Sequence, residues 1–378
     1  MYNTMKRFTL LLCAALLTLG ACGQKETTGT KDKEEEKKDE VTFYKGADIS
    51  WVTEMESKGN RFYNAKGEER DCFVLMKELG LNAVRLRVWV NPSDGWCGRS
   101  DFLAKAKRAA AQGLDIMVDF HYSDSWADPQ MQYKPAAWEG KSLKELMIAL
   151  SDHTSEIMND LKSAGITPKW VQIGNEIRPG MLWDTDASIS GAAYDVTQNG
   201  KTFKANFTNL VSFLNTGYAA VKAVFPDTIV IIHLDNSYDN SLYTYYFDKV
   251  KSLGGKWDMI GMSIYPYWTK QSKPDYEADQ VITDCINNIK LVSTRYDCDV
   301  MIVETGVECA DGNGNLASDT VLKEGYRQMA RIVDESLNGT SGRCKGVFYW
   351  EPECKPGTYR LGAFTADGRP TVIMDAFK

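Results

Sequence analysis

Short apolar runs alternate with amphipathic stretches along the chain from residue 41 onward. The run at residues 170–173 is closed by Gly and Pro, which is typical of a buried strand that ends abruptly. Segments with helical spacing lie between the runs, such as residues 71–79 and 102–112, which each end before a glycine. The pattern predicts strands at residues 47–50, 83–90, 115–121, 170–175, 228–234, 259–264, 300–304 and 346–350.

Eight strands separated by helices predict a (β/α)8 TIM barrel of the α/β class. A doubly wound open sheet is the alternative, but neither GxGxxG nor GxxxxGK[ST] occurs in the sequence. No repeat or second domain boundary is evident, so residues 41–378 are expected to form one domain. Long loops after strands are what a barrel uses to build a cleft; here they are residues 91–100, 122–141, 178–201 and 307–319.

The amino terminus has the pattern of an export signal. Lys6 and Arg7 precede an apolar run at residues 8–19, which is too short for an ordinary membrane-spanning helix. The run leads into Leu-Gly-Ala-Cys, which resembles a bacterial lipobox with Cys22 as the lipid-bearing residue. An ordinary signal with an incidental Cys22 is the alternative. Residues 1–22 are therefore predicted to be a lipoprotein signal peptide.

Residues 23–40 contain no aromatic or large aliphatic side chain, and twelve of the eighteen are charged. Such a stretch cannot bury surface and is predicted to be a disordered, charged tether. We therefore expect an exported, membrane-anchored lipoprotein at a bacterial outer membrane or cell surface. Nine cysteines minus Cys13 and Cys22 leave an odd number, so at least one buried thiol is expected to be free.

Composition and motifs exclude several functions. The net charge of −7 argues against a general nucleic-acid binder. Catalytic zinc is not expected, because the chain has three histidines and no HExxH. A Ser-His-Asp hydrolase would need a GxSxG elbow, which is absent.

Two predicted strands each deliver a carboxylate at their carboxyl ends, Glu176 and Glu304. Paired carboxylates about 5–5.5 Å apart are what retaining glycoside hydrolysis needs. Glu304 is the better nucleophile if Arg85 and Tyr265 keep it ionised. Glu176 would need a raised pKa to act first as acid and then as base.

Other polar and aromatic residues gather at the predicted strand ends. Each has an ordinary structural interpretation, since a strand-end Asp often caps the next helix and an Arg can simply neutralise a carboxylate. Together they are harder to dismiss, because unpaired charges on buried strands are costly. Asn175 is suited to hold a sugar 2-hydroxyl and Trp350 to stack on a pyranose ring. The predicted substrate-binding residues are Asp48, Arg85, Asp119, His121, Trp126, Asn175, His233, Tyr265 and Trp350. Two of four loop tryptophans are expected to touch substrate: Trp126, Trp138, Trp183 and Trp268.

Seven motifs follow in order: GADIS at residues 46–50, VRLRVW at 84–89, DFHYSDSWADP at 119–129, QIGNE at 172–176, DMIGMSIYP at 258–266, VET at 303–305 and YWEP at 349–352. Over residues 43–378 the chain resembles the family 53 arabinogalactan endo-β-1,4-galactanases, which are clan A retaining glycosidases. The resemblance implies endo-hydrolysis of internal β-1,4-galactosidic bonds in pectic (arabino)galactan, with Glu176 as acid/base and Glu304 as nucleophile. The alternatives are another clan A endo-glycosidase such as a β-mannanase, or a non-catalytic lipoprotein that captures surface glycans.

A run of alternating oxygen-bearing side chains and glycines, residues 311–315, is one way to wrap a hard cation. Some bacterial family 53 members carry a calcium loop shortly after the seventh strand, and this placement is similar. One structural calcium is thus expected on Asp311, Asn313 and Asn315, with Glu308 or Asp319 completing the shell; a plain glycine-rich turn is the alternative.

No organic cofactor is expected. The expected partners are galactan or galacto-oligosaccharides and a membrane, and the chain is expected to be a monomer.

Overall fold

The computed structural model describes residues 42–184 and 207–378. The predicted signal peptide and tether therefore lie outside the described residues, as does most of the predicted loop at residues 178–201.

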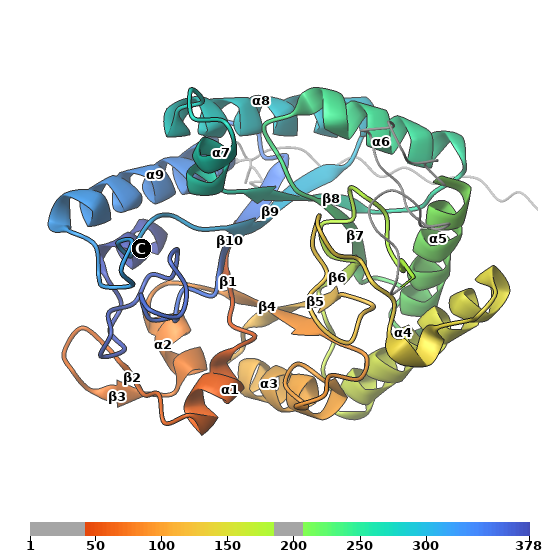
Figure 1. The fold of residues 1–378 in the computed structure, drawn as a ribbon, viewed down its shortest axis with the longest axis horizontal. Helices are drawn as coiled ribbons and strands as arrows, with labels where there is room; N and C mark the ends of the chain where they lie inside the picture. Colours follow the sequence, from red (N-terminus) through yellow and green to blue (C-terminus); the bar gives the residue numbers. More distant parts are fainter. Residues whose placement is uncertain (1–41, 185–206) are drawn as a thin grey trace, which may run out of the picture. The chain divides into compact units, whose positions relative to one another are not determined.

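Eight parallel strands form a closed barrel in the order β1-β10-β9-β8-β7-β6-β5-β4, which confirms the predicted (β/α)8 fold (Figure 1). All eight predicted runs are strands in this barrel, with ends that shift by a few residues. A small antiparallel hairpin of β2 (Phe62–Tyr63) and β3 (Glu69–Arg70) stands apart from it. The barrel strands are β1 (Tyr44–Asp48), β4 (Ala83–Val88), β5 (Asp115–Phe120), β6 (Trp170–Ile173), β7 (Ile229–Leu234), β8 (Met259–Ile264), β9 (Asp299–Thr305) and β10 (Cys344–Trp350).

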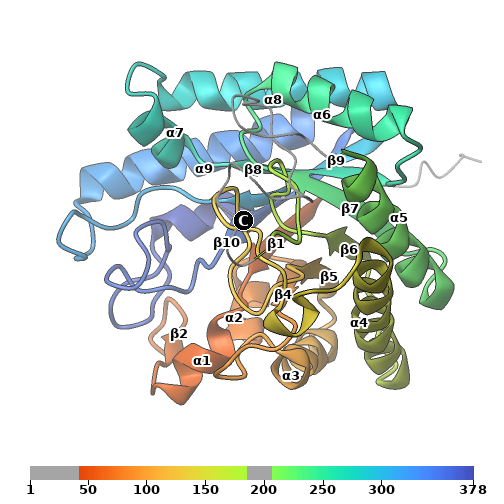
Figure 2. The ribbon, with the colours of Figure 1, turned by 45° about the vertical axis from the view of Figure 1, so that its right-hand side comes forward.

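Helices ring the outside of the barrel and cover the apolar outer faces of the strands (Figures 1 and 2). The longest, α4, begins at a capping box in which Ser142 Oγ accepts the Glu145 N–H and Glu145 accepts the Ser142 N–H. The described helices are α1 (Val52–Ser57), α2 (Cys72–Glu78), α3 (Arg99–Ala111), α4 (Leu143–Ser163), α5 (Phe207–Val224), α6 (Asn240–Ser252), α7 (Pro266–Ser272), α8 (Ala278–Tyr296) and α9 (Asp319–Asn338), with 3-10 turns η1 (Ala136–Trp138) and η2 (Val372–Phe377).

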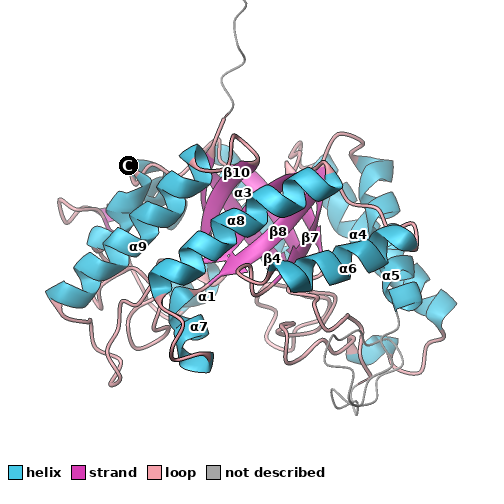
Figure 3. Ribbon diagram, turned by 90° about the horizontal axis from the view of Figure 1, so that it is seen from above, coloured by secondary structure: helices cyan, strands magenta, loops and turns pink. Residues whose placement is uncertain are grey.

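Apolar side chains fill the inside of the barrel. Phe348 packs so closely on β1 that a Cβ at Gly46 would lie 2.3 Å from its ring, so only glycine fits there. The barrel-interior cluster consists of Ala83, Met117, Trp170, Ile231, Met259, Met301, Val303 and Phe348. Beyond this cluster the strands carry polar residues at their carboxyl ends, which is where the functional face of this fold is built. Figure 3 shows the long connecting loops gathered on one side of the strands.

All seven cysteines in the described part of the chain are free thiols, and six of them are buried. The expectation of at least one buried free thiol is confirmed. Within residues 42–184 and 207–378, no helix has the length and apolar character needed to cross a membrane.

Candidate active site

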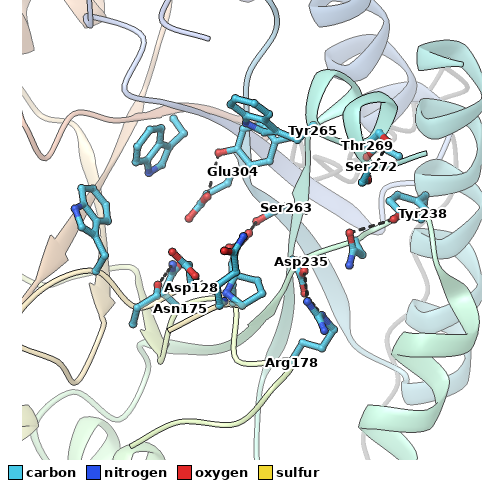
Figure 4. Close-up of a pocket in the computed structure, with 18 of the residues that line it drawn as sticks. Asp128, Asn175, Arg178, Asp235, Tyr238, Ser263, Tyr265, Thr269, Ser272 and Glu304 are labelled. Atoms are coloured by element: carbon cyan, nitrogen blue, oxygen red, sulfur yellow. Dashed lines mark hydrogen bonds and ion pairs between the residues drawn. The ribbon is translucent and has the colours of Figure 1, made fainter. Parts of the chain in front are cut away.

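A cavity of about 850 Å³ opens at the carboxyl ends of the strands (Figure 4). Both predicted carboxylates, Glu176 and Glu304, line it. Glu176 follows β6 in a sharp turn with a left-handed backbone at Gly174 (φ 86°) and at Glu176 itself (φ 47°). A Cβ at residue 174 would lie 2.5 Å from the Ile177 side chain, so the turn that aims Glu176 into the cavity needs glycine.

Glu304 is held at the end of β9 by a cation and a hydroxyl. Arg85 Nη2 lies 2.8 Å from Glu304 Oε1, and the Tyr265 hydroxyl donates to Oε2 at 3.0 Å. Burial raises the pKa of Glu304 to about 7, while Arg85 and Tyr265 pull that pKa down. These contacts are those that the sequence analysis expected to favour the ionised form.

Glu176 has a different environment. Its only hydrogen-bond donor among the described residues is the Ser263 hydroxyl, which lies 2.6 Å from Oε1. Burial, followed by the nearby carboxylates Glu304 and Asp235, raises the pKa of Glu176 well above its usual range. The surroundings of Glu176 therefore favour its protonated form, whereas Arg85 and Tyr265 favour the ionised form of Glu304.

One residue of β8 links the two carboxyl groups. Ser263 is the register partner of Glu304 between β8 and β9, and its hydroxyl binds Glu176. The Coulombic effect of Glu304 on the pKa of Glu176 reflects the same closeness. The structure thus brings together two residues that stand 128 positions apart in the sequence.

A buried polar layer lies beneath the cavity floor and is organised by Arg85. Its guanidinium is 2.7 Å from Asp48 Oδ2 and 2.8 Å from Asp119 Oδ2, and it donates to Gln172 Oε1 at 2.7 Å and Asn175 Oδ1 at 2.8 Å. Burial by itself raises the pKa of Asp119, but the charge of Arg85 opposes it, and the pKa is lowered to about 2. The network satisfies each charge internally, as buried charges require.

Four of the nine predicted substrate-binding residues lie in or against this layer, fully buried, rather than in the cavity: Asp48, Arg85, Asp119 and His233. Their polar atoms bind one another or Gln172 within this layer, and direct contact with substrate stays a prediction for these four residues. The other five line the cavity: His121, Trp126, Asn175, Tyr265 and Trp350.

His121 is fixed as a neutral ring by its partners. Its Nδ1 accepts from Trp89 Nε1 at 3.2 Å and from the Ala127 N–H at 3.1 Å. The single ring hydrogen therefore sits on Nε2, which lies 3.0 Å from Asp119 Oδ2. These three hydrogen bonds hold the His121 ring in place at the cavity wall.

Aromatic rings form one end of the cavity. Trp51 lies 5.5 Å from Trp126 and 5.2 Å from Trp350, measured between ring centres. Of the four loop tryptophans, Trp126 and Trp268 line the cavity. Trp138 and Trp183 are instead buried, Trp138 against His153 of α4 and Trp183 against Tyr133.

Three features near the cavity were given no role from the sequence. Ser263 stands within an apolar strand and gave no signal of its own. Arg178 pairs with Asp235 through contacts of 2.8 and 3.1 Å, and only the strand order brings these two residues together. Asp128, together with Glu304 and Asp235, is one of three carboxylates in the cavity wall near Glu176.

The predicted calcium loop is a tight turn closed by its own amides. Asp311 Oδ1 accepts the N–H groups of Asn313 at 2.8 Å and Asn315 at 2.9 Å. Glu308 is paired with Arg360, whose guanidinium also donates to the Asp311 carbonyl. In this structure Arg360 therefore contacts Glu308 and the Asp311 carbonyl, and the calcium expected from the sequence stays a prediction. No cluster of three acidic, His or Cys ligands occurs among the described residues.

A TIM barrel with a carboxylate at the end of β9 and another just after β6, both facing one cavity, belongs to the glycoside hydrolase class of enzymes. More narrowly, the chain belongs to glycosyl hydrolase family 53, whose family model matches residues 44–368.

Named relatives agree with this assignment. The chain is 32% identical over 321 residues to the arabinogalactan endo-beta-1,4-galactanase of Thermothelomyces thermophilus, covering 82% of this chain and 89% of that protein. It is 30% identical over 333 residues to the endo-beta-1,4-galactanase of Bacillus subtilis, covering 83% of this chain and 71% of that protein. A solved fungal beta-1,4-galactanase superposes with a TM-score of 0.73 at 28% identity, covering 88% of this chain and 98% of that one.

Proposed function

We propose that this protein is a retaining endo-β-1,4-galactanase that hydrolyses internal bonds of (arabino)galactan. The observation that carries the chemistry is the unequal environment of the two carboxyl groups. Glu304 has a cation, Arg85, and the Tyr265 hydroxyl to stabilise its charge. Among the described residues, Glu176 has only the Ser263 hydroxyl as a hydrogen-bond donor, and it stands near the carboxylates Glu304, Asp235 and Asp128. Membership of family 53 and the galactanase names of the relatives support the substrate.

In the first step, Glu304 attacks the anomeric carbon while Glu176 gives its proton to the glycosidic oxygen, so the leaving chain departs as an alcohol. A bond from C1 to the Glu304 carboxylate replaces the glycosidic bond. In the second step, Glu176 removes a proton from water as the water oxygen attacks C1, and Glu304 leaves as a carboxylate. The acid form of Glu176 is restored and the anomeric configuration is retained.

The cavity wall supplies groups to hold the sugar. Asn175 Nδ2 donates one hydrogen to the Ala127 carbonyl at 2.8 Å, which leaves its second amide hydrogen for the sugar 2-hydroxyl. Trp126 and Trp350 offer apolar faces for pyranose rings at one end of the cavity, and Trp268, 43% exposed, offers another.

Reducing-sugar release from galactan, mannan and xylan tests the proposal. We expect release from galactan, and loss of turnover in the Glu304→Ala variant with oligosaccharide binding retained. Release from mannan alone would favour a mannanase. Binding without release from any of the three would favour a glycan-capturing protein. Substantial activity of the Glu304→Ala variant would contradict its role as nucleophile.

We also propose that the barrel is an exported lipoprotein anchored through Cys22. The apolar run at residues 8–19 and the charged residues 23–40 support this. The chain enters the barrel at the amino end of β1, Tyr44, whereas the cavity opens at the carboxyl ends of the strands. Labelling with a fatty-acid analogue tests the lipid anchor: wild type should be labelled and Cys22→Ser should not.

A further inference from the structure

A chain of three hydrogen-bonded side chains runs from β7 to Glu176. His233 Nε2 lies 2.7 Å from Ser263 Oγ, which in turn lies 2.6 Å from Glu176 Oε1. His233 is fully buried, and Ser263 is 3% exposed at the cavity wall (Figure 4). The direction in which hydrogens point along this chain decides what it does to Glu176.

The amide of Gln172 fixes the role of one His233 nitrogen. Arg85 Nε donates to Gln172 Oε1 at 2.7 Å, so the other end of that amide is the NH2 group. Gln172 Nε2 lies 3.1 Å from Asp119 Oδ1 and 3.0 Å from His233 Nδ1, which accounts for its two hydrogens. His233 Nδ1 is therefore an acceptor.

One further contact at His233 Nδ1 agrees with this. The backbone N–H of Glu176 points at it from 3.4 Å. Asn175 Oδ1, an acceptor that also bonds Arg85 Nη2 at 2.8 Å, lies 3.0 Å from Nδ1, but two donors, Gln172 Nε2 and the Glu176 N–H, face the same nitrogen. Burial, followed by Arg85, lowers the pKa of His233 well below its usual range, so the ring is neutral. Its one hydrogen is on Nε2 and is donated to Ser263 Oγ.

Because Ser263 Oγ receives a hydrogen from His233, its own hydrogen is donated to Glu176 Oε1. We propose that Ser263, oriented by His233, is a positioning residue that keeps the acid proton of Glu176 on Oε2. No described residue donates to Oε2, so the proton there is free for the glycosidic oxygen. After the proton leaves, the same Ser263 bond stabilises the Glu176 carboxylate, which then takes a proton from water on Oε2. This inference rests on the proposed acid/base role of Glu176.

Other charged and titratable groups also face Glu176: Glu304 on β9, Asp235 after β7, Asp128 in the loop after β5, Arg178 after β6 and Tyr265 after β8. All of them remain in a Ser263→Ala variant. A change in the titration of Glu176 in that variant is therefore due to the lost hydroxyl.

The test compares two substrates in the Ser263→Ala variant. Galactan has a poor leaving group that needs the acid proton, whereas a dinitrophenyl β-galactobioside has a leaving group that does not. We expect kcat/KM on galactan to fall about 10-fold to 100-fold, part of what general acid catalysis contributes. We expect little change in kcat/KM on the aryl substrate. The alkaline limb of kcat/KM on galactan should move to higher pH, because a donor that favours the charged form of Glu176 is gone.

Ser237→Ala is the matched control, because Ser237 is also a buried serine next to β8 but does not line the cavity. It should leave both substrates and the pH profile unchanged. Ser263→Cys keeps the side-chain shape with a slightly larger and weaker donor, and it replaces the alanine variant in the test if that variant does not fold. Unchanged kinetics on galactan, or equal losses on both substrates, would overturn the inference.

Glu176→Gln separates this inference from the proposed function. An inactive Glu176→Gln variant beside a wild-type-like Ser263→Ala variant overturns only the role of Ser263. A Glu176→Gln variant with wild-type activity on galactan overturns the acid/base role itself.

Discussion

The guanidinium carbon of Arg87 lies 4.4 Å from the centre of the Trp126 ring, beneath the aromatic end of the cavity. Trp51 and Trp89 flank the same guanidinium at 5.4 Å each. Arg87 Nη1 is 2.8 Å from Glu351 Oε1, while Arg87 Nε and Nη2 have no hydrogen-bond partner in the described residues. A buried cation thus supports the ring on which we expect a sugar to stack.

Removing this cation should weaken substrate binding. A desolvated cation–π contact is worth about 2 kcal/mol, so loss of Arg87 should raise KM for galactan by up to roughly 30-fold with little change in kcat. Arg87→Met alone would also leave Glu351 unpaired and cost about 3–5 kcal/mol of stability. The double variant Arg87→Met/Glu351→Gln removes both charges and isolates the effect on binding. An unchanged KM in that double variant would show that Arg87 does not hold the Trp126 platform.

Replacing Tyr265 by Phe should shift the pH dependence of activity. Its hydroxyl favours the ionised form of Glu304, so its loss raises the pKa of that carboxyl above about 7. Because the nucleophile must be ionised, the acid limb of kcat/KM should move to higher pH. A hydrogen bond to a charged group is worth about 1.5–3 kcal/mol, so we expect roughly a 10-fold or greater loss below neutrality. Tyr238→Phe, whose hydroxyl contacts Asn236 instead, should leave the limb in place.

Glu353 should make stability depend on pH. Its side chain is fully buried, neither oxygen has a hydrogen-bond donor among the described residues, and burial followed by Glu351 raises its pKa well above the usual range. A raised folded-state pKa contributes stability that is full below the unfolded pKa of about 4.3 and is lost as pH rises. Glu353→Gln should therefore raise Tm near pH 8, with the gain shrinking towards pH 4.5. An equal Tm difference at both pH values would contradict this.

The turn at residues 311–315 should be stable without metal, because the Asp311 carboxylate already accepts two backbone N–H groups. We expect Asp311→Ala to lower Tm slightly through lost hydrogen bonds, and a chelator to leave Tm of the wild type unchanged. A chelator-induced fall in Tm that calcium restores would instead establish the calcium site predicted from the sequence.

The sequence predicted the location of a residue correctly where its position along a single strand determines which face of the barrel it lies on. Glu304 ends an apolar run and Glu176 closely follows one, and a barrel brings the carboxyl ends of all strands to one face. The eight strands followed from the same periodicity. That a residue is polar does not reveal how deeply its side chain is buried. Arg85 and His233 were therefore expected at the substrate, although both lie beneath the cavity floor.

Contacts set by strand register could not be predicted. Ser263 binds Glu176 because β8 stands beside β9 and the β6 turn folds towards it, and no local pattern encodes that pairing. Trp183 was a candidate for sugar stacking, but it is buried beside Tyr133. The loop sequence does not reveal whether a tryptophan turns towards the cavity or the barrel.

The most direct test is to trap the covalent intermediate. An activated fluoro-substituted galactobioside should react with the enzyme, and peptide mass spectrometry should find the sugar on Glu304. The product anomer from galactan should have the starting configuration. Label on Glu176, or a product of inverted configuration, would contradict the assignment of Glu304 as nucleophile.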